Sequence, residues 1–241
     1  TLATAPRENC SLQVDEKKQP RFAVCVDQED EEGRYDIRTE LYRLGDDGKW
    51  ALVSSGKNGG MQVRVMGVAK DGTIYAVEDD GKAPAAFGTL DRQTGEFRKI
   101  FQDEVSEVSR YVVSPTDDKP LAVVTEAGIP RIELVDEQHA DTELYTSLAA
   151  AFPGQVVNFS TATRDGSKVV VSVYSDRNPG ELYLFDRDTG KARFLMKARE
   201  WVNPENSASV RPFDFVNRDG MRIYGYLTLP KGSDGKNLPL I

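Results

Sequence analysis

The chain has very few residues of the kinds that build metal and catalytic centres. Among its 241 residues there is one histidine, His139, so a metal site with two imidazole ligands is excluded. His139 lies in the polar stretch 137–141, which we interpret as an exposed turn between strands without a catalytic role. The sequence contains neither a Gly-x-Ser-x-Gly motif nor a Gly-x-x-x-x-Gly-Lys phosphate loop. We therefore predict no catalytic residue, no cofactor and no metal site in this chain.

Long apolar runs and clusters of positive charge are also absent. No run approaches the roughly 18 apolar residues of a membrane-spanning helix, so no membrane span is predicted. The net charge of −8 argues against a nucleic-acid partner, which requires clustered Lys and Arg. Residues 1–6 lack an initiator Met and the basic and apolar regions of a signal peptide, and residues 237–241 stop within an apolar run. We expect both ends to lie inside a longer protein.

Only two cysteines are present, Cys10 and Cys25. If their hairpin turns around residues 17–18, antiparallel partners have numbers that add up to 35, so Cys10 faces Cys25 and Val14 faces Arg21. Directly opposed residues lie close enough for a disulfide. The alternative is two small buried thiols on one face of a sheet. A disulfide would favour a periplasmic or secreted location over the cytoplasm, but the sequence does not decide the compartment.

A repeated hairpin organises the rest of the sequence. Residues 181–196 read as an apolar strand, a polar turn and a second strand. Residues 85–101 are a close copy and residues 40–53 a looser one. The most degraded copy is 131–136 followed by 142–145, with one or two helical turns expected within 144–152. The copies are marked by turn aspartates at steps of 45, 45 and 50 residues: Asp46, Asp91, Asp136 and Asp186.

A second hairpin precedes each copy, with turns at 15–16, 71–72, 116–117 and 165–166. Repeats of roughly 40–50 residues that hold several short strands are typical of β-propeller blades. A single β-sandwich also has closely spaced strands, but it gives no reason for constant turn spacing over four units. We therefore predict an all-β fold with a partial β-propeller of about four blades. The charged residues 27–34 interrupt the first copy and are predicted to form an exposed loop.

The blade pattern ends near residue 197. Residues 198–210 carry Pro, Asn and Ser and read as a linker, whereas residues 211–230 form another hairpin with a tight-turn signal at Asp219-Gly220. A further apolar strand begins at residue 238. The predicted domains are a partial β-propeller at 1–197, a linker at 198–210 and a separate set of strands at 211–241.

Several short motifs in the C-terminal part form one pattern. They are Arg-Pro-Phe-Asp-Phe-Val at 211–216, Arg-Asp-Gly at 218–220, Ile-Tyr-Gly-Tyr-Leu-Thr-Leu-Pro at 223–230 and Leu-Pro-Leu-Ile at 238–241. This pattern resembles the domain junction of the prolyl oligopeptidase family of serine peptidases. The blade motif Leu-Tyr-Leu-Phe-Asp at 182–186, followed by Thr-Gly at 189–190, is also similar to blades of that family. The sequence looks closest to bacterial acylaminoacyl-peptidase-like or dipeptidyl-peptidase-like members.

The resemblance implies a function that the residues of this chain do not themselves carry. In that family a propeller precedes an α/β-hydrolase domain, so residues 211–241 would be the first strands of a truncated α/β-hydrolase domain. The propeller restricts access to short peptides, and a Ser-His-Asp triad cleaves them by acyl transfer. The triad would lie outside this chain, which alone should be inactive.

The usual propeller of the family has more blades than the four counted here. We therefore expect as partners the missing blades and the hydrolase domain, or self-association of this chain. Two alternatives compete with a peptidase fragment. A non-catalytic propeller that mediates protein–protein interaction would have no need of the strands at 211–241. A propeller enzyme with its own channel site would need polar or metal-binding residues repeated among the blades, which the single histidine makes unfavourable.

Overall fold

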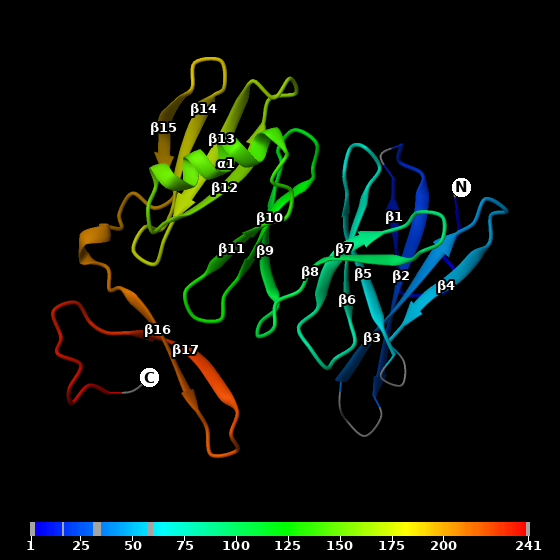
Figure 1. Ribbon diagram of the computed structural model, residues 1–241, viewed down its shortest axis with the longest axis horizontal. Helices are drawn as coiled ribbons and strands as arrows, with labels where there is room; N and C mark the ends of the chain where they lie inside the picture. The colour runs from blue at the N-terminus through cyan, green and yellow to red at the C-terminus, as the bar shows by residue number, and fades with distance from the viewer. Residues whose placement is uncertain (1–2, 16, 31–34, 57–59, 240–241) are drawn as a thin grey trace. The chain divides into compact units, whose positions relative to one another are not determined.

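The computed structural model describes residues 3–15, 17–30, 35–56 and 60–239. Within these ranges the chain forms five antiparallel sheets, and in each sheet every strand pairs with its neighbours in sequence (Figure 1). Four successive sheets of three or four strands are followed by a two-stranded hairpin. The predicted all-β class and the four blade-like repeats are confirmed, because a propeller blade is a sheet of this kind.

The bounds of the elements follow the repeats. Sheet 1 contains β1 (Cys10–Val14), β2 (Pro20–Asp30), β3 (Tyr35–Leu44) and β4 (Trp50–Ser55). Sheet 2 contains β5 (Gln62–Val68), β6 (Ile74–Asp79), β7 (Ala86–Leu90) and β8 (Phe97–Phe101). Sheet 3 contains β9 (Val108–Val113), β10 (Pro120–Thr125) and β11 (Arg131–Leu134), followed by helix α1 (Ala140–Ala151). Sheet 4 contains β12 (Val156–Ala162), β13 (Lys168–Tyr174), β14 (Glu181–Asp186) and β15 (Lys191–Lys197). A 3-10 turn, η2 (Pro204–Asn206), precedes the hairpin of β16 (Val210–Val216) and β17 (Arg222–Thr228).

The chain divides into two compact units, each with its own core. Unit 1 comprises Thr1–Ser109 and Asp117–Lys119, and unit 2 comprises Arg110–Thr116 and Pro120–Ile241. In unit 1, residues of sheets 1 and 2 form the core: Phe22, Leu41, Val63, Ile74, Ala76 and Leu90. In unit 2, sheet 3, α1 and sheet 4 supply Val112, Leu121, Ala122, Val124, Tyr145, Leu148, Val157, Val169, Val171 and Val173. Consecutive sheets within each unit therefore bury their apolar faces against one another.

Strand β13 shows how the sequence produces this packing. Its burial alternates along the strand, and Val169, Val171 and Val173 are the buried residues. Side chains of a strand point to opposite faces in turn, so three valines at alternate positions form one apolar face. Strand β10 is buried at all six of its positions, since it lies in the middle of sheet 3.

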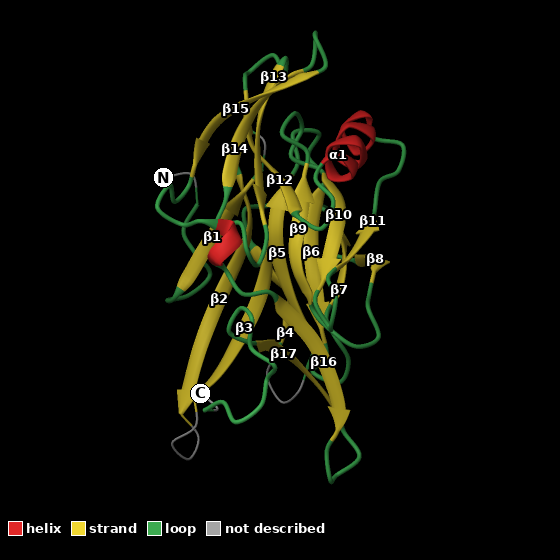
Figure 2. Cartoon of the chain, turned by 90° about the vertical axis from the view of Figure 1, so that its left-hand side faces the viewer, coloured by secondary structure: helices red, strands yellow, loops and turns green. Residues whose placement is uncertain are grey.

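Helix α1 differs from the sequence-based prediction. A degraded hairpin copy with one or two helical turns was expected, but the structure has a helix of 12 residues that packs against β10 and β12 (Figure 2, red). Asp141 and Glu143 lie in its first turn, where negative charge favours the helix. His139, predicted to be in an exposed turn, is partly buried and caps the helix, because its Nδ1 accepts a hydrogen bond of 3.0 Å from the backbone N–H of Asp141. Sheet 3 thus has three strands and a helix after them.

The predicted loop at 27–34 is also partly wrong. Asp27–Asp30 continue β2 and pair with residues 35–38 of β3, so the charged run lengthens a hairpin. Residues 31–34 lie outside the described residues. The hairpin predicted around Asp219-Gly220 is present, with β16 paired to β17 and Gly220 at a φ of 81°. Among the described residues, no helix has the length and apolar character needed to cross a membrane.

A glycine contact between sheets 1 and 2 leads to a prediction. Gly95 has a φ of 77°, and a Cβ placed on it would lie 2.9 Å from both Cγ atoms of Val53. We expect Gly95→Ala to reduce the free energy of unfolding by about 1–2 kcal/mol for the left-handed backbone, and by about 1–3 kcal/mol more for overpacking. Urea unfolding followed by circular dichroism measures the loss.

The matched control for this substitution is Gly190→Ala. Gly190 occupies the equivalent position in sheet 4, with a φ of 65°, and a Cβ placed on it would meet no surrounding atom within 4 Å. It should therefore lose only the backbone contribution. Equal losses in the two variants would show that the contact with Val53 has no influence on stability.

Candidate functional site

Two places among the described residues are candidates for a functional site. One is the corner of sheet 1 that contains both cysteines. The other is a hollow in unit 2 where the β16–β17 hairpin meets sheets 3 and 4.

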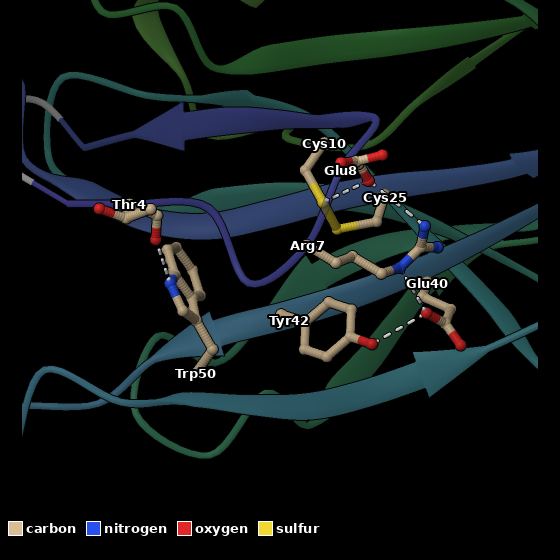
Figure 3. The surroundings of a disulfide bond; sticks show 8 residues. All are labelled: Thr4, Arg7, Glu8, Cys10, Cys25, Glu40, Tyr42 and Trp50. Atoms are coloured by element: carbon tan, nitrogen blue, oxygen red, sulfur yellow. Dashed lines mark hydrogen bonds and ion pairs between the residues drawn. A yellow bond between two sulfur atoms is a disulfide. The ribbon is translucent and has the colours of Figure 1, made fainter.

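Cys10 and Cys25 face each other across β1 and β2, and their sulfurs are bonded (Figure 3). The register follows the expected sum of 35 from Cys10↔Cys25 to Gln13↔Phe22. It then shifts, so Val14 pairs with Pro20 and not with Arg21 as predicted. Cys25 is fully buried, whereas Cys10 is partly exposed. The bond fixes the edge strand of sheet 1 to its neighbour.

The same corner holds the segment before β1 against the sheet. Trp50 donates from Nε1 to the carbonyl oxygen of Thr4 at 2.7 Å (Figure 3). Arg7 donates from Nε to the buried carboxylate of Glu40 at 3.1 Å, and the same carboxylate accepts from the Tyr42 hydroxyl at 2.9 Å. Burial and the hydrogen bond to Glu40 raise the pKa of the Tyr42 hydroxyl. The carboxylate is occupied by these donors, which tie the segment before β1 to sheet 1.

The hollow in unit 2, which we call the hairpin hollow, has a volume of about 490 Å³. Its wall comes from six segments of unit 2: the β10–β11 turn, the α1–β12 turn, β12, the β13–β14 turn, β16 and β17. The lining is mostly apolar, and its residues are Glu126, Gly128, Ile129, Pro130, Gly154, Val156, Ser175, Asp176, Val210, Pro212 and Tyr226.

Hydrogen bonds tie the hairpin to sheet 3 at the edge of this hollow. The Tyr226 hydroxyl on β17 lies 2.7 Å from the carbonyl oxygens of Glu126 and Gly128, and it donates to one or the other. The Glu126 carboxylate in turn accepts from Arg110 Nη2 at 2.9 Å. The Arg110 guanidinium also lies 5.7 Å from the centre of the Tyr174 ring, within range of a cation–π contact. The hollow can accept an apolar group beside a carboxylate, and its lining contains no histidine to activate a nucleophile.

Sequence analysis missed two buried carboxylates, Asp15 and Asp141. Each side chain is only 2% exposed and forms an ion pair with an arginine of another sheet, Arg92 and Arg187 respectively. The signal that could have found these pairs is the arginine directly after the repeated turn aspartates Asp91 and Asp186.

The disulfide gives a testable prediction. The bond spans a separation of 15 residues, so its loss should reduce the free energy of unfolding by about 3 kcal/mol. Urea unfolding with and without a phosphine reductant measures the difference, and the Cys10→Ala/Cys25→Ala variant, which should not respond to reductant, is the control. Free thiols that titrate in the native, non-reduced chain would contradict the bond.

No family model matches the sequence. A curated protein does: dipeptidyl aminopeptidase BIII of Pseudoxanthomonas mexicana is 28% identical over 173 residues, which is 71% of this chain and 24% of that protein. A second match is dipeptidyl peptidase family member 6 of Caenorhabditis elegans, 27% identical over 54% of this chain and 17% of that protein. The chain therefore spans about a quarter or less of the curated relatives it matches.

Solved structures have the same fold. Puromycin hydrolase aligns over 95% of this chain and 35% of its own, with 18% identity and a TM-score of 0.53. At this level of identity the alignment shows the fold alone, so the relationship to a family rests on the sequence matches. Together the matches agree with the resemblance to prolyl oligopeptidase-family peptidases read from the sequence, and the chain corresponds in length to only a part of the proteins that it matches.

Proposed function

We propose that this chain is part of the substrate-gating propeller of a serine peptidase that cleaves short peptides. One observation carries the proposal, the sequence relationship to a dipeptidyl aminopeptidase over 71% of the chain. The fold is consistent with it, because the four successive sheets are blade-like and align with the structure of puromycin hydrolase over 95% of the chain.

We propose the domain division read from the sequence, and the ends of the elements support it. The partial propeller at 1–197 ends where β15 ends, at Lys197. The linker at 198–210 contains η2, and the strands at 211–241 contain most of the separate β16–β17 sheet. We propose that this hairpin is the entry to an α/β-hydrolase domain.

The chemistry would be acyl transfer by a Ser-His-Asp triad that lies outside this chain. In such a triad the serine attacks the peptide carbonyl, the histidine takes and returns its proton, and the aspartate orients the histidine. The contribution of this chain is to restrict which peptides reach that centre. By itself it should have no peptidase activity.

The experiment that tests the proposal uses a fluorophosphonate probe, which labels activated serines. It is applied to this chain and to the complete protein of which the chain is proposed to be a part. We expect labelling of the complete protein and none of this chain. If the complete protein is not labelled, a propeller that binds protein partners becomes the better hypothesis. Labelling of the isolated chain would show that this chain contains an activated serine, against our prediction.

The Tyr226 contact gives a second prediction, on the attachment of the hairpin. Tyr226→Phe removes one neutral hydrogen bond between β17 and the β10–β11 turn, and we expect a loss of about 1 kcal/mol in unfolding free energy. Hydrogen exchange should rise in the β10–β11 turn and in β17. Tyr224→Phe is the matched control, because Tyr224 lies two residues away on the same face of β17 and should leave both quantities unchanged.

A further inference from the structure

The turns between the third and fourth strands of sheets 2 and 4 share the sequence Asp-Arg-x-Thr-Gly, at 91–95 and 186–190. In both turns the aspartate binds its own turn. Asp91 Oδ1 accepts from the backbone N–H groups of Gln93 at 2.8 Å and Thr94 at 2.6 Å, and Asp186 Oδ1 accepts at 3.1 Å from the two corresponding N–H groups. One oxygen of each aspartate thus binds its own turn, although the other oxygen of Asp186 also pairs with Lys168 at 2.5 Å. The arginine that follows each aspartate reaches away from the turn.

In unit 1 that arginine reaches a buried carboxylate of the preceding sheet. Arg92 Nη2 lies 2.5 Å from Asp15 Oδ2, although the two residues are 77 positions apart. Asp15 lies in the β1–β2 turn of sheet 1. Its other oxygen accepts from the backbone N–H groups of Lys17 at 2.9 Å and Gln19 at 2.8 Å, and Arg21 adds a second cation at 2.9 Å.

In unit 2 the equivalent arginine does the same with a different acceptor. Arg187 Nη1 lies 2.6 Å from Asp141 Oδ1, in the first turn of α1. The other carboxylate oxygen accepts from Ser114 Oγ at 2.6 Å and from Thr116 Oγ1 at 2.7 Å, both in the β9–β10 turn. In each unit an arginine of the second sheet is therefore paired with a buried carboxylate from the part of the chain before that sheet, the β1–β2 turn in unit 1 and helix α1 in unit 2.

We propose that the Asp-Arg-x-Thr-Gly turn is an inter-sheet latch, whose arginine recognises a buried carboxylate in the preceding sheet or, for Asp141, in the helix that follows that sheet. The corresponding turns of sheets 1 and 3 read Asp46-Asp47-Gly48 and Asp136-Glu137 and carry no arginine. The motif thus marks the second sheet of each unit, and it occurs once for each of the two cores. This inference does not rest on the proposed peptidase function.

The carboxylates are arranged as acceptors for a cation. Burial by itself would raise the pKa of Asp15, but hydrogen bonds from Gln19, Arg21 and Lys17 lower it below its ordinary value. Burial likewise would raise the pKa of Asp141, and Arg187, Ser114 and Thr116 lower it. Removal of Arg187 leaves Asp141 buried without that cation, and removal of Arg92 leaves Asp15 paired with Arg21 of its own sheet. Either change should loosen the contact between the two sheets, because the pair that joins them is lost.

The test uses the full 241-residue chain and hydrogen exchange measured by mass spectrometry. We expect Arg92→Met to speed exchange at least tenfold around Asp15, with unit 2 unchanged. Arg187→Met should do the same in the first turn of α1 and at residues 114–116 of the β9–β10 turn, with unit 1 unchanged. The matched controls are Arg98→Met and Arg193→Met, which remove exposed arginines six positions after the latch arginines and should change neither region.

A second comparison keeps the proposal falsifiable if an arginine variant folds poorly. Asp141→Asn keeps the shape of the acceptor and removes its charge. In that background Arg187→Met should have no further effect on exchange, since the two residues act as one contact. The latch is overturned if the Arg→Met variants exchange like their controls, or if the effects of Asp141→Asn and Arg187→Met multiply as independent changes.

Discussion

The structure depends on one constraint, which is that a small antiparallel sheet must bury an apolar face against another element. Sheets 1 and 2 do this for each other around Phe22 and Leu41, and sheets 3 and 4 do it with α1 around Tyr145 and the valines of β13. The hydrophobic effect alone does not fix how one sheet is oriented on the next. Directional contacts at the turns fix this orientation within each unit, since Gly95 allows close approach to Val53 and the two arginines reach buried carboxylates.

Local features of the fold could be predicted from the sequence because they depend on near neighbours. Turn residues and alternating apolar positions located the hairpins, and the same rules aligned Cys10 with Cys25. The bulge that shifts Val14 was not visible, because nothing in the residues 13–20 marks an extra residue in one strand. Helix α1 was underestimated since its cap is a histidine, which is not among the usual N-cap residues.

The contacts that matter most at long range could not be predicted in the same way. Asp15 and Arg92 are 77 positions apart, and no local pattern says that one will face the other. The hairpin hollow could not be predicted either, because it forms where the β10–β11 turn and β17 meet through Tyr226. The proposed function rests on a different kind of observation. The described residues hold inter-sheet ion pairs, a disulfide corner and a hollow, whereas the relation to peptidases came from sequence similarity spread over many positions.

Helix α1 has a consequence for the edge of sheet 3. After β11 the chain enters the helix and adds no further strand, so β11 is the last strand of sheet 3. Such an edge could template a strand from a neighbouring molecule and start an aggregate. Here the edge strand has only four residues, all exposed, and two of them are the oppositely charged Arg131 and Glu133. A short, charged edge is a poor template, and it protects the sheet at the place where the repeat is incomplete.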